Sequence, residues 1–174
     1  KFNFLIEGDN LHSLKLLEKT HRNKIDLIYI DPPYNTGNKD FLYDDSYIDK
    51  NDGYSHSKWL SFMSKRLELA RSLLKYNGFI FISIDDNEFS QLKLLCDEIF
   101  NESNYVNEII WQKLTASKSQ SVYLSKLHEK VLVYRKSENA RLNKIYEDIL
   151  ENDKSYKYIE ENTGRKYGSF DFTQ

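Results

Sequence analysis

The sequence predicts an α/β fold, with a mostly parallel, twisted sheet and helices on both faces. Short apolar runs alternate along the chain with segments whose apolar residues recur at helical spacing. The short runs are nearly continuous in apolar residues, which is typical of parallel strands covered on both faces. An aspartate closely follows three of these runs, and the ligands of open α/β sheets bind beyond the carboxyl ends of the strands. We therefore expect a site at that edge.

The first elements follow from apolar runs and capping residues. Residues 2–6 form an apolar run that stops before Asp9, so we expect a strand there. Leucines at helical spacing come next, and Asp9 or Asn10 is suited to cap the helix that they predict. A second buried strand is expected over residues 25–30.

The middle of the chain carries a long loop and a long helix. The polar stretch 35–52 has no hydrophobic period, and a loop of that length inside a compact domain is typically functional or mobile. An amphipathic helix is expected from Trp59 to Leu74, with Asn77-Gly78 as its stop. The remaining expected elements are strands over 79–84, 106–111 and 130–134, a helix over 89–99 begun by Asp85 or Asp86, and a helix near 142–150.

The charge balance limits the functions open to the chain. A net charge of −2 and a pI of about 6.1 argue against a purely electrostatic coat on DNA. The charges are segregated, however: residues 113–136 carry six basic residues against one acid, and residues 40–52 carry five aspartates against one lysine. The basic segment is suited to face phosphate, although two solvated loops give the same pattern.

Composition also bears on location. There is neither a long apolar stretch nor a signal peptide, so we expect no membrane span and a cytoplasmic protein. The single cysteine, Cys96, cannot form an internal disulfide, which fits a reducing compartment. Because it sits at helical spacing among apolar residues, we expect a buried side chain there rather than a catalytic thiol.

The sharpest signal is Asp31-Pro32-Pro33-Tyr34, directly after the second strand. Two prolines make a stiff, extended exit without amide donors of its own. A carboxylate, carbonyl acceptors and an aromatic ring remain, and this set is suited to grip a planar base through an amino group. A strand that happens to end in a proline-rich turn gives the same four residues, but the buried strand before and the polar loop after favour a site.

The chemistry of an adenine amine explains the residue types. Its lone pair is delocalised into the ring, which makes the amine a poor nucleophile. If Asp31 and the Pro32 carbonyl accept its two N–H bonds, the lone pair turns towards an incoming methyl group, and the carboxylate stabilises the developing positive charge. Tyr34 can stack on the base and replace the stacking lost when the base leaves the duplex.

Residues 31–37 resemble the catalytic motif of amino-group DNA methyltransferases that attack adenine N6, whereas cytosine-N4 relatives more often carry Ser in place of Asp31. Further segments match the same class, and the whole set is similar to the modification subunit of type III restriction–modification systems. These segments are 7–11, 56–67, 81–88, 107–113 and 128–134.

The resemblance implies a Rossmann-like methyltransferase fold with S-adenosylmethionine as cofactor and no metal. It implies double-stranded DNA, a second copy of the chain and a restriction (helicase–nuclease) subunit as partners. In this class a glycine-bearing cofactor loop, Phe-x-Gly-x-Gly, follows the catalytic motif, and none occurs here. We therefore expect an incomplete N-terminal part, with residues 1–137 catalytic and residues 138–174 a partial tail leading towards the missing target-recognition or cofactor-loop region.

The resemblance also assigns roles to residues. It makes Asp31, Pro32 and Tyr34 catalytic, and it places Asp9 against the adenine amine of the cofactor. Asp9 is equally well explained as a helix cap. Residues suited to shape the base pocket are Pro33, Asn35, Thr36 and Gly37, while His56 has no assigned role.

Other functions remain open at this point. One alternative is an amine methyltransferase that acts on RNA, protein or cytosine N4 through a similar motif. A catalytically retired domain that only binds a partner is a second alternative, although an intact Asp31 and Tyr34 speak against it. A plain nucleotide-binding domain is a third, but the chain lacks a phosphate-cradling glycine loop.

Overall fold

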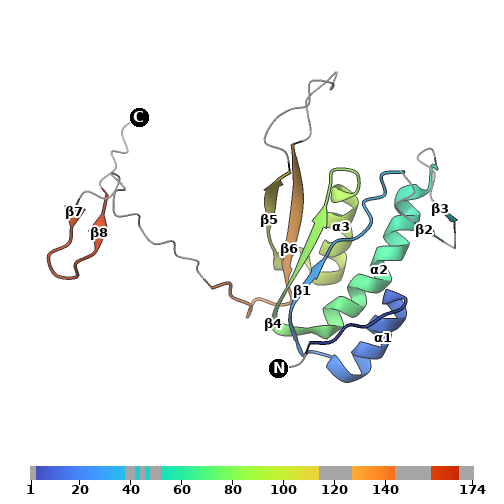
Figure 1. The fold of residues 1–174 in the computed structure, drawn as a ribbon, viewed down its shortest axis with the longest axis horizontal. Coiled ribbons are helices and arrows are strands. Elements are labelled where there is room, and N and C mark those ends of the chain that lie inside the picture. The colour runs from blue at the N-terminus through green and yellow to red at the C-terminus, as the bar shows by residue number, and fades with distance from the viewer. Residues whose placement is uncertain are drawn as a thin grey trace, which may run out of the picture. The chain divides into compact units, whose positions relative to one another are not determined.

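The computed structural model describes residues 3–37, 52–113, 127–143 and 158–168, together with the backbone of 42–43 and 46–47. The chain divides into two compact units, residues 1–141 and 142–174 (Figure 1). The first unit holds the main sheet and the helices. In the second, β7 (Tyr158–Ile159) pairs with β8 (Lys166–Tyr167) in an antiparallel ribbon.

The main sheet has four strands in the order β1-β4-β6-β5 (Figure 1). The strands are β1 (Ile25–Ile30), β4 (Leu74–Ile84), β5 (Tyr105–Gln112) and β6 (His128–Arg135). β1 and β4 are parallel, whereas β4–β6 and β5–β6 are antiparallel. The described sheet is therefore mixed rather than mostly parallel. The reason lies in the return from β5 to β6, where the Lys113 amide donates to the Leu127 carbonyl at 2.8 Å, because strands that turn back on each other pair antiparallel.

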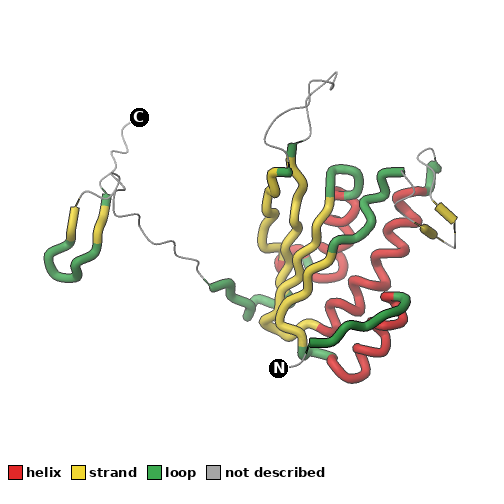
Figure 2. The backbone as a smooth tube through the Cα atoms, in the orientation of Figure 1, coloured by secondary structure: helices red, strands yellow, loops and turns green. Residues whose placement is uncertain are grey.

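Three helices, α1 (Asn10–His21), α2 (Ser55–Leu73) and α3 (Phe89–Phe100), lie side by side on one face of this sheet (Figures 1 and 2). Period-two alternation separates the two faces. On β4, Ile80 and Ile82 are fully buried under the helices, whereas Leu27 and Tyr29 on β1 are 56% and 60% exposed. The expected helices on both faces are thus seen on one face only among the described residues.

The core lies between the sheet and helices α2 and α3. Each large apolar side chain buried there contributes about 1.5–3 kcal/mol relative to exposure. Cys96 is among them, and burial raises the pKa of its thiol, which confirms the expected buried side chain. The helical members of this core are Trp59, Met63, Leu67, Ala70, Leu92, Cys96 and Phe100, and the strand members are Leu74, Ile80, Ile82, Ile84, Leu132 and Tyr134.

The expected strand over residues 2–6 is wrong. Residues 3–7 have no regular structure, and Phe4 and Leu5 are 85% and 96% exposed. An apolar run becomes a strand only when a neighbouring strand accepts its backbone hydrogen bonds, and no described strand pairs with this one.

The stop assigned to the long helix is also wrong. α2 ends at Leu73, and β4 begins at Leu74, so Asn77 and Gly78 lie inside a strand. The β1–β4 register shifts between Ile25 and Leu27, and a Cβ on Gly78 would lie 3.0 Å from the Asp26 carbonyl. The glycine therefore lies at an irregularity where β1 and β4 approach closely. An Asn-Gly pair can thus mark a close approach of two strands as well as the end of a helix.

Smaller differences concern the loop and the third helix. The expected loop contains two short antiparallel strands, β2 (Leu42–Tyr43) and β3 (Ser46–Tyr47). α3 begins after Glu88 rather than at Asp85 or Asp86, and a 3-10 turn, η1 (Glu102–Asn104), follows it. Most of the expected helix near 142–150, and most of both charged segments, lie outside the described residues. Within the described part of the chain, no helix combines the length and apolar character that a membrane crossing requires.

Candidate active site at the carboxyl edge of the sheet

The motif lies where β1 leaves the sheet. Asp31 follows the last residue of β1, and Asp85 follows the last residue of β4. Because these strands are parallel neighbours, their carboxyl ends meet at one edge. β6 enters the sheet at the same edge, since Ile84 pairs with Lys130. The expected meeting of acids at this edge is therefore confirmed for Asp31 and Asp85.

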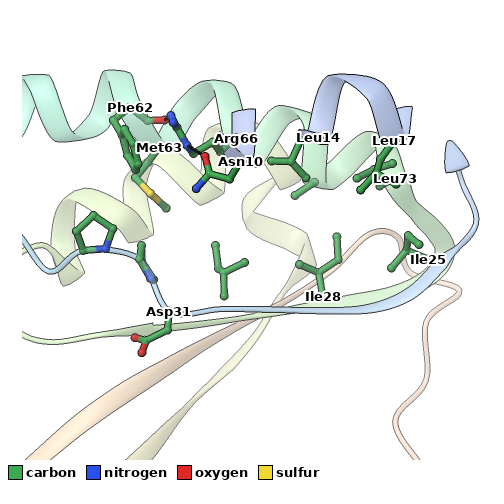
Figure 3. A pocket seen from close by; sticks show the side chains of 14 residues that line it. Asn10, Leu14, Leu17, Ile25, Ile28, Asp31, Phe62, Met63, Arg66 and Leu73 are labelled. Carbon is green, nitrogen blue, oxygen red and sulfur yellow. Dashed lines mark hydrogen bonds between the residues drawn. The ribbon is translucent and has the colours of Figure 1, made fainter. Parts of the chain in front are cut away.

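Asp31 presents its carboxylate away from the helices. In Figure 3 its side chain leaves β1 on the side opposite to Ile28, which points towards α1 and α2. The residue is exposed. A carboxylate that is exposed and rigidly held at a strand end can accept hydrogen bonds from an incoming ligand. Little protein surface has to be uncovered for this.

Tyr34 turns back towards Asp31. Its ring packs against the main core and is only half-exposed. Burial raises the pKa of Tyr34, and a hydrogen bond from its hydroxyl to Asp31 raises the pKa further. The hydroxyl is thus neutral at physiological pH and donates to the carboxylate, a contact that the sequence did not suggest.

A cation stands beside these acids. Lys113, at the end of β5, forms an ion pair with Glu129 on β6. The hydrogen bond to Glu129 raises the pKa of Lys113, and the charges of Asp85 and Asp31 add to the effect. Lys113 is exposed, so this pair contributes little to stability. It places a positive charge at the edge to which Asp31 belongs.

The backbone of the motif is anchored from α2. The indole N–H of Trp59 donates to the Pro33 carbonyl at 2.7 Å, and Trp59 is fully buried. Trp59 begins the amphipathic helix expected from the sequence, and in the structure it also makes this hydrogen bond. The indole uses the carbonyl of Pro33 and not that of Pro32, the acceptor expected to meet an amine.

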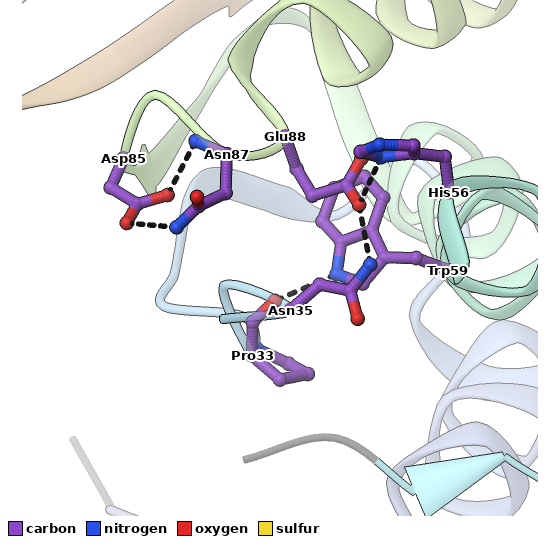
Figure 4. A network of polar contacts seen from close by, with 7 residues as sticks. All are labelled: Pro33, Asn35, His56, Trp59, Asp85, Asn87 and Glu88. Carbon is purple, nitrogen blue, oxygen red and sulfur yellow. Dashed lines mark hydrogen bonds and ion pairs between the residues drawn. The ribbon is translucent and has the colours of Figure 1, made fainter. Parts of the chain in front are cut away.

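A buried carboxylate holds the residue after the motif. Glu88 is 0% exposed, and its Oε1 accepts from Asn35 Nδ2 at 2.5 Å and contacts His56 Nδ1 at 2.7 Å (Figure 4). Asn35 adopts a φ of 55°, in the left-handed region that asparagine tolerates better than most residues. Sequence reasoning assigned no role to Glu88 or His56. The only signal was their presence in two of the matching segments.

The acid after β4 has a different environment from the acid after β1. Asp85 accepts the Asn87 amide at 2.9 Å and the Asn87 side chain at 2.6 Å, which closes a turn before α3 (Figure 4). In this structure Asp85 is thus a hydrogen-bond acceptor that holds the turn.

Asp9 caps α1. Its Oδ1 accepts the His12 amide at 2.9 Å, and this bond lowers the pKa of Asp9. The helix-cap explanation of Asp9 is thereby confirmed, whereas its contact with a cofactor stays a prediction. Next to it, Asn10 accepts a hydrogen bond from the guanidinium of Arg66 on α2 at 2.7 Å.

A cavity of about 480 Å³ opens between β1, α1 and α2 (Figure 3). This volume is within the range of small-molecule sites, and the lining is mainly apolar. Three motif residues line it: Asp31, Pro32 and Pro33. The other polar groups at its wall are Asn10 and Arg66.

Thr36 and Gly37 are the last two residues of the motif segment 31–37. Gly37 has a φ of 77°, which glycine adopts without the penalty that a side chain brings. Thr36 lies between Asn35 and Gly37 and is half-buried. Among the described residues, no group of three or more His, Cys, Asp or Glu side chains is placed to hold a metal ion.

The chain matches a protein family and several known proteins in sequence. A family model described as DNA methylase, N6_N4_Mtase, matches residues 25–171. The EcoP15I Mod subunit of a type III restriction–modification enzyme from Escherichia coli is 43% identical, over 68% of this chain and 22% of that protein. The StyLTI Mod subunit from Salmonella typhimurium is 48% identical, over 64% of this chain and 20% of that protein. The chain thus spans about a fifth of the length of these relatives.

Solved structures agree on the fold. A methylase assigned to DNA modification in Thermus thermophilus, solved in complex with S-adenosyl-L-methionine, superposes with a TM-score of 0.55. It covers 76% of this chain and 56% of that chain at 17% identity, a level that speaks to fold alone. The Rossmann-like class predicted from sequence is confirmed, with a mixed sheet among the described strands.

Proposed function

The chain belongs to the DNA methylase family N6_N4_Mtase, and we propose that it forms part of the catalytic region of a DNA methyltransferase acting on the N6 amine of adenine. The observation that carries the proposal is the mounting of Asp31-Pro32-Pro33-Tyr34 at the carboxyl edge of the sheet. Asp31 is exposed there while the following backbone is held by Trp59. The family match favours DNA over RNA or protein as substrate.

In the proposed reaction, a flipped-out adenine enters beside Asp31. The Asp31 carboxylate and the Pro32 carbonyl accept the two N–H bonds of the amine, which directs its lone pair at the methyl donor. The new N–C bond would form as the S–C bond of the methyl donor breaks, and the methylated amine would then release one proton to solvent. Asp31 stabilises the positive charge that develops on the nitrogen, and a preplaced charge is the main source of such catalysis. Tyr34 stacks on the base.

We propose S-adenosylmethionine as the methyl donor, since when bound it supplies a sulfonium methyl group to the amine. The chain offers a cavity of about 480 Å³ that reaches Asp31, Pro32 and Pro33. Asn10, the first residue of α1, lines this cavity, and Asp9 precedes it in the sequence. The His12 amide engages one oxygen of Asp9, and a carboxylate has a second oxygen that can accept from the cofactor's adenine amine. These features fit the cofactor.

The remaining motif residues are proposed to shape the base pocket. The Pro33 carbonyl bonds Trp59, and the Asn35 side chain bonds Glu88, so both residues are committed to protein partners. We propose that they set the position of the loop, while Thr36 and Gly37 let the backbone approach the base.

The whole protein is proposed to be a modification subunit. The support is the similarity to two type III Mod subunits, of which the chain covers about a fifth. On this proposal, residues 1–137 are catalytic and residues 138–174 lead towards a target-recognition or cofactor-loop region. The partners would be double-stranded DNA, a second copy of the chain and a restriction subunit, in the cytoplasm.

The test uses the full-length parent protein, labelled S-adenosylmethionine and unmethylated bacterial genomic DNA, with the modified nucleoside identified by mass. Label in N6-methyladenine is expected, and Asp31→Ala should lower it by about 100-fold or more, as removal of one charge-stabilising group does elsewhere. Glu98→Ala, an exposed acid on α3, is the matched control and should behave as wild type. Label in N4-methylcytosine would overturn the base, and no label in DNA would overturn the substrate.

A further inference from the structure

We propose that Glu88 is the positioning residue of the catalytic loop: its buried carboxylate binds Asn35 and His56 and so fixes the backbone that follows Tyr34. The inference rests on the proposed function, because it assigns a role within that same site. It joins three segments that are far apart in sequence, namely the motif loop, the first turn of α2 and the turn before α3 (Figure 4).

The burial of Glu88 calls for an explanation beyond packing. The residue is 0% exposed, and burying a carboxylate is costly unless hydrogen bonds compensate. Both of its contacts converge on Oε1, while Oε2 is buried without a hydrogen-bond partner among the described residues. Glu88 occupies the N-cap position of α3, yet its side chain does not cap that helix. The carboxylate therefore serves the loop and not its own helix.

The loop residue that Glu88 holds is conformationally demanding. Asn35 has a φ of 55°, a region that costs free energy for residues with side chains. The 2.5 Å bond from its Nδ2 to Glu88 fixes the side chain and with it the backbone turn. Such strain persists only where the surroundings over-determine the conformation, and Glu88 is the group that does so here.

A second anchor lies one turn away on α2. His56 and Trp59 are three residues apart, so they share one face of the helix. Trp59 donates a hydrogen bond to the Pro33 carbonyl. His56 contacts the same Glu88 oxygen that accepts from Asn35. Tyr34 lies between these two fixed points. Loss of the Glu88 anchor would leave the loop attached on one side only, and a displacement of about 1 Å at a reacting group can cost about 100-fold in rate.

The decisive experiment compares Glu88→Ala and Glu88→Gln in the full-length protein, with Glu98→Ala on the neighbouring helix α3 as the control. Steady-state methyl transfer to saturating unmethylated genomic DNA gives kcat, and titration gives the Kd for S-adenosylmethionine. We expect Glu88→Ala to lower kcat about 10- to 100-fold with little change in that Kd. Glu88→Gln keeps an oxygen at the Oε1 position and should restore most of kcat. Equal loss in both variants, or none in either, overturns the proposal.

A double-mutant cycle with Asn35→Gly separates positioning from general damage to the fold. Glycine tolerates the positive φ but removes the Nδ2 donor. If Glu88 acts through Asn35, Glu88→Gln and Glu88→Ala add little to the loss already caused by Asn35→Gly. Multiplicative losses would mean that the two residues act independently, which overturns the proposal.

Hydrogen exchange of the peptide covering residues 31–37 makes the test independent of catalysis. Exchange should accelerate in Glu88→Ala and in Asn35→Gly, but not in Glu98→Ala. Unchanged exchange overturns the positioning role whatever the methyl transfer shows. Faster exchange in a protein that methylates no DNA would keep the positioning role and reject the proposed function.

Discussion

The carboxyl ends of β1 and β4 carry the same sequence signal, an acid after a buried strand, but the structure uses them differently. At the β1 end, Asp31 is exposed, and its backbone is held by a group from another element. At the β4 end, Asp85 closes a turn with Asn87, and Glu88 is buried and hydrogen-bonded. One end presents an exposed carboxylate, and the other holds the loop that follows it.

Because the two ends differ in burial, substitutions at each end should change a different measured quantity. Surface positions contribute little to the free energy of unfolding, whereas buried hydrogen-bonded groups are costly to remove. A change to the exposed Asp31 carboxylate should therefore lower methyl transfer and spare stability. Changes to the groups that anchor it should lower both.

After Asp31, the largest effect within this comparison is expected at Tyr34. Tyr34→Ala removes the ring that stacks on the base, and stacking is worth about 1–3 kcal/mol per base, or roughly 5- to 150-fold in single-turnover rate. Tyr34→Phe keeps the ring and removes the hydroxyl bond to Asp31, so it should retain more activity. If Tyr34→Phe falls as far as Tyr34→Ala, the hydroxyl bond rather than the ring carries the effect.

Because burial and Asp31 raise the pKa of Tyr34, its hydroxyl remains protonated through the ordinary value of 10. Ionisation of Tyr34 should therefore cause no loss of activity or stability below that pH. The contribution of the neutral hydroxyl to stability is fully present below pH 10 and is lost only as the pH rises above it.

A smaller, mixed effect is expected at Trp59. Trp59→Phe removes the donor to the Pro33 carbonyl, and an unmade buried hydrogen bond costs about 1–3 kcal/mol of unfolding free energy. Methyl transfer should fall as well, because the motif backbone loses one anchor. The matched control is Trp111→Phe on β5, where the side chain is 62% exposed and thermal unfolding should be unchanged. Equal thermal midpoints for both variants would contradict the anchoring role of Trp59.

The smallest effect is expected at Asp9, which is exposed but engaged as a helix cap. Asn caps helices as well as Asp does, so Asp9→Asn should leave stability at pH 7 unchanged. The His12 amide lowers the pKa of Asp9, so the ionised form stabilises the fold above the ordinary value of 3.8, and this contribution is lost as the pH falls through the lowered pKa. Asp9→Asn should flatten that acid dependence in thermal unfolding.

The same variant tests the second role proposed for Asp9. A weaker affinity for S-adenosylmethionine at pH 7, with the cap intact, would place Asp9 at the cofactor. Unchanged affinity would leave it a cap alone.

The sequence was sufficient for what depends on local patterns. The short apolar run over residues 79–84 predicted a strand, and β4 contains it. The motif at Asp31 predicted the edge at which a site is expected. Local patterns were insufficient where one sequence pattern is compatible with two different local structures. Asn77-Gly78 is typical of a helix stop, but its glycine permits the close approach of β1 to β4.

Contacts between distant segments were beyond the sequence. Residues 35, 56 and 88 meet only after α2 and α3 pack side by side, and nothing in their spacing predicts the Glu88 contacts. The strand order placed β6 between β4 and β5, which depends on pairing partners rather than on any one strand. The apolar run before Asp9 failed as a strand for the same reason.

Because Cys96 on α3 is buried, its chemical reactivity can report how this helix moves relative to the sheet. A thiol reagent attacks the thiolate, and burial both shields the sulfur and raises the pKa of the thiol. Labelling of Cys96 therefore requires α3 to separate from the sheet. As the single cysteine among these 174 residues, Cys96 makes the labelling rate a direct measure of how often that separation occurs.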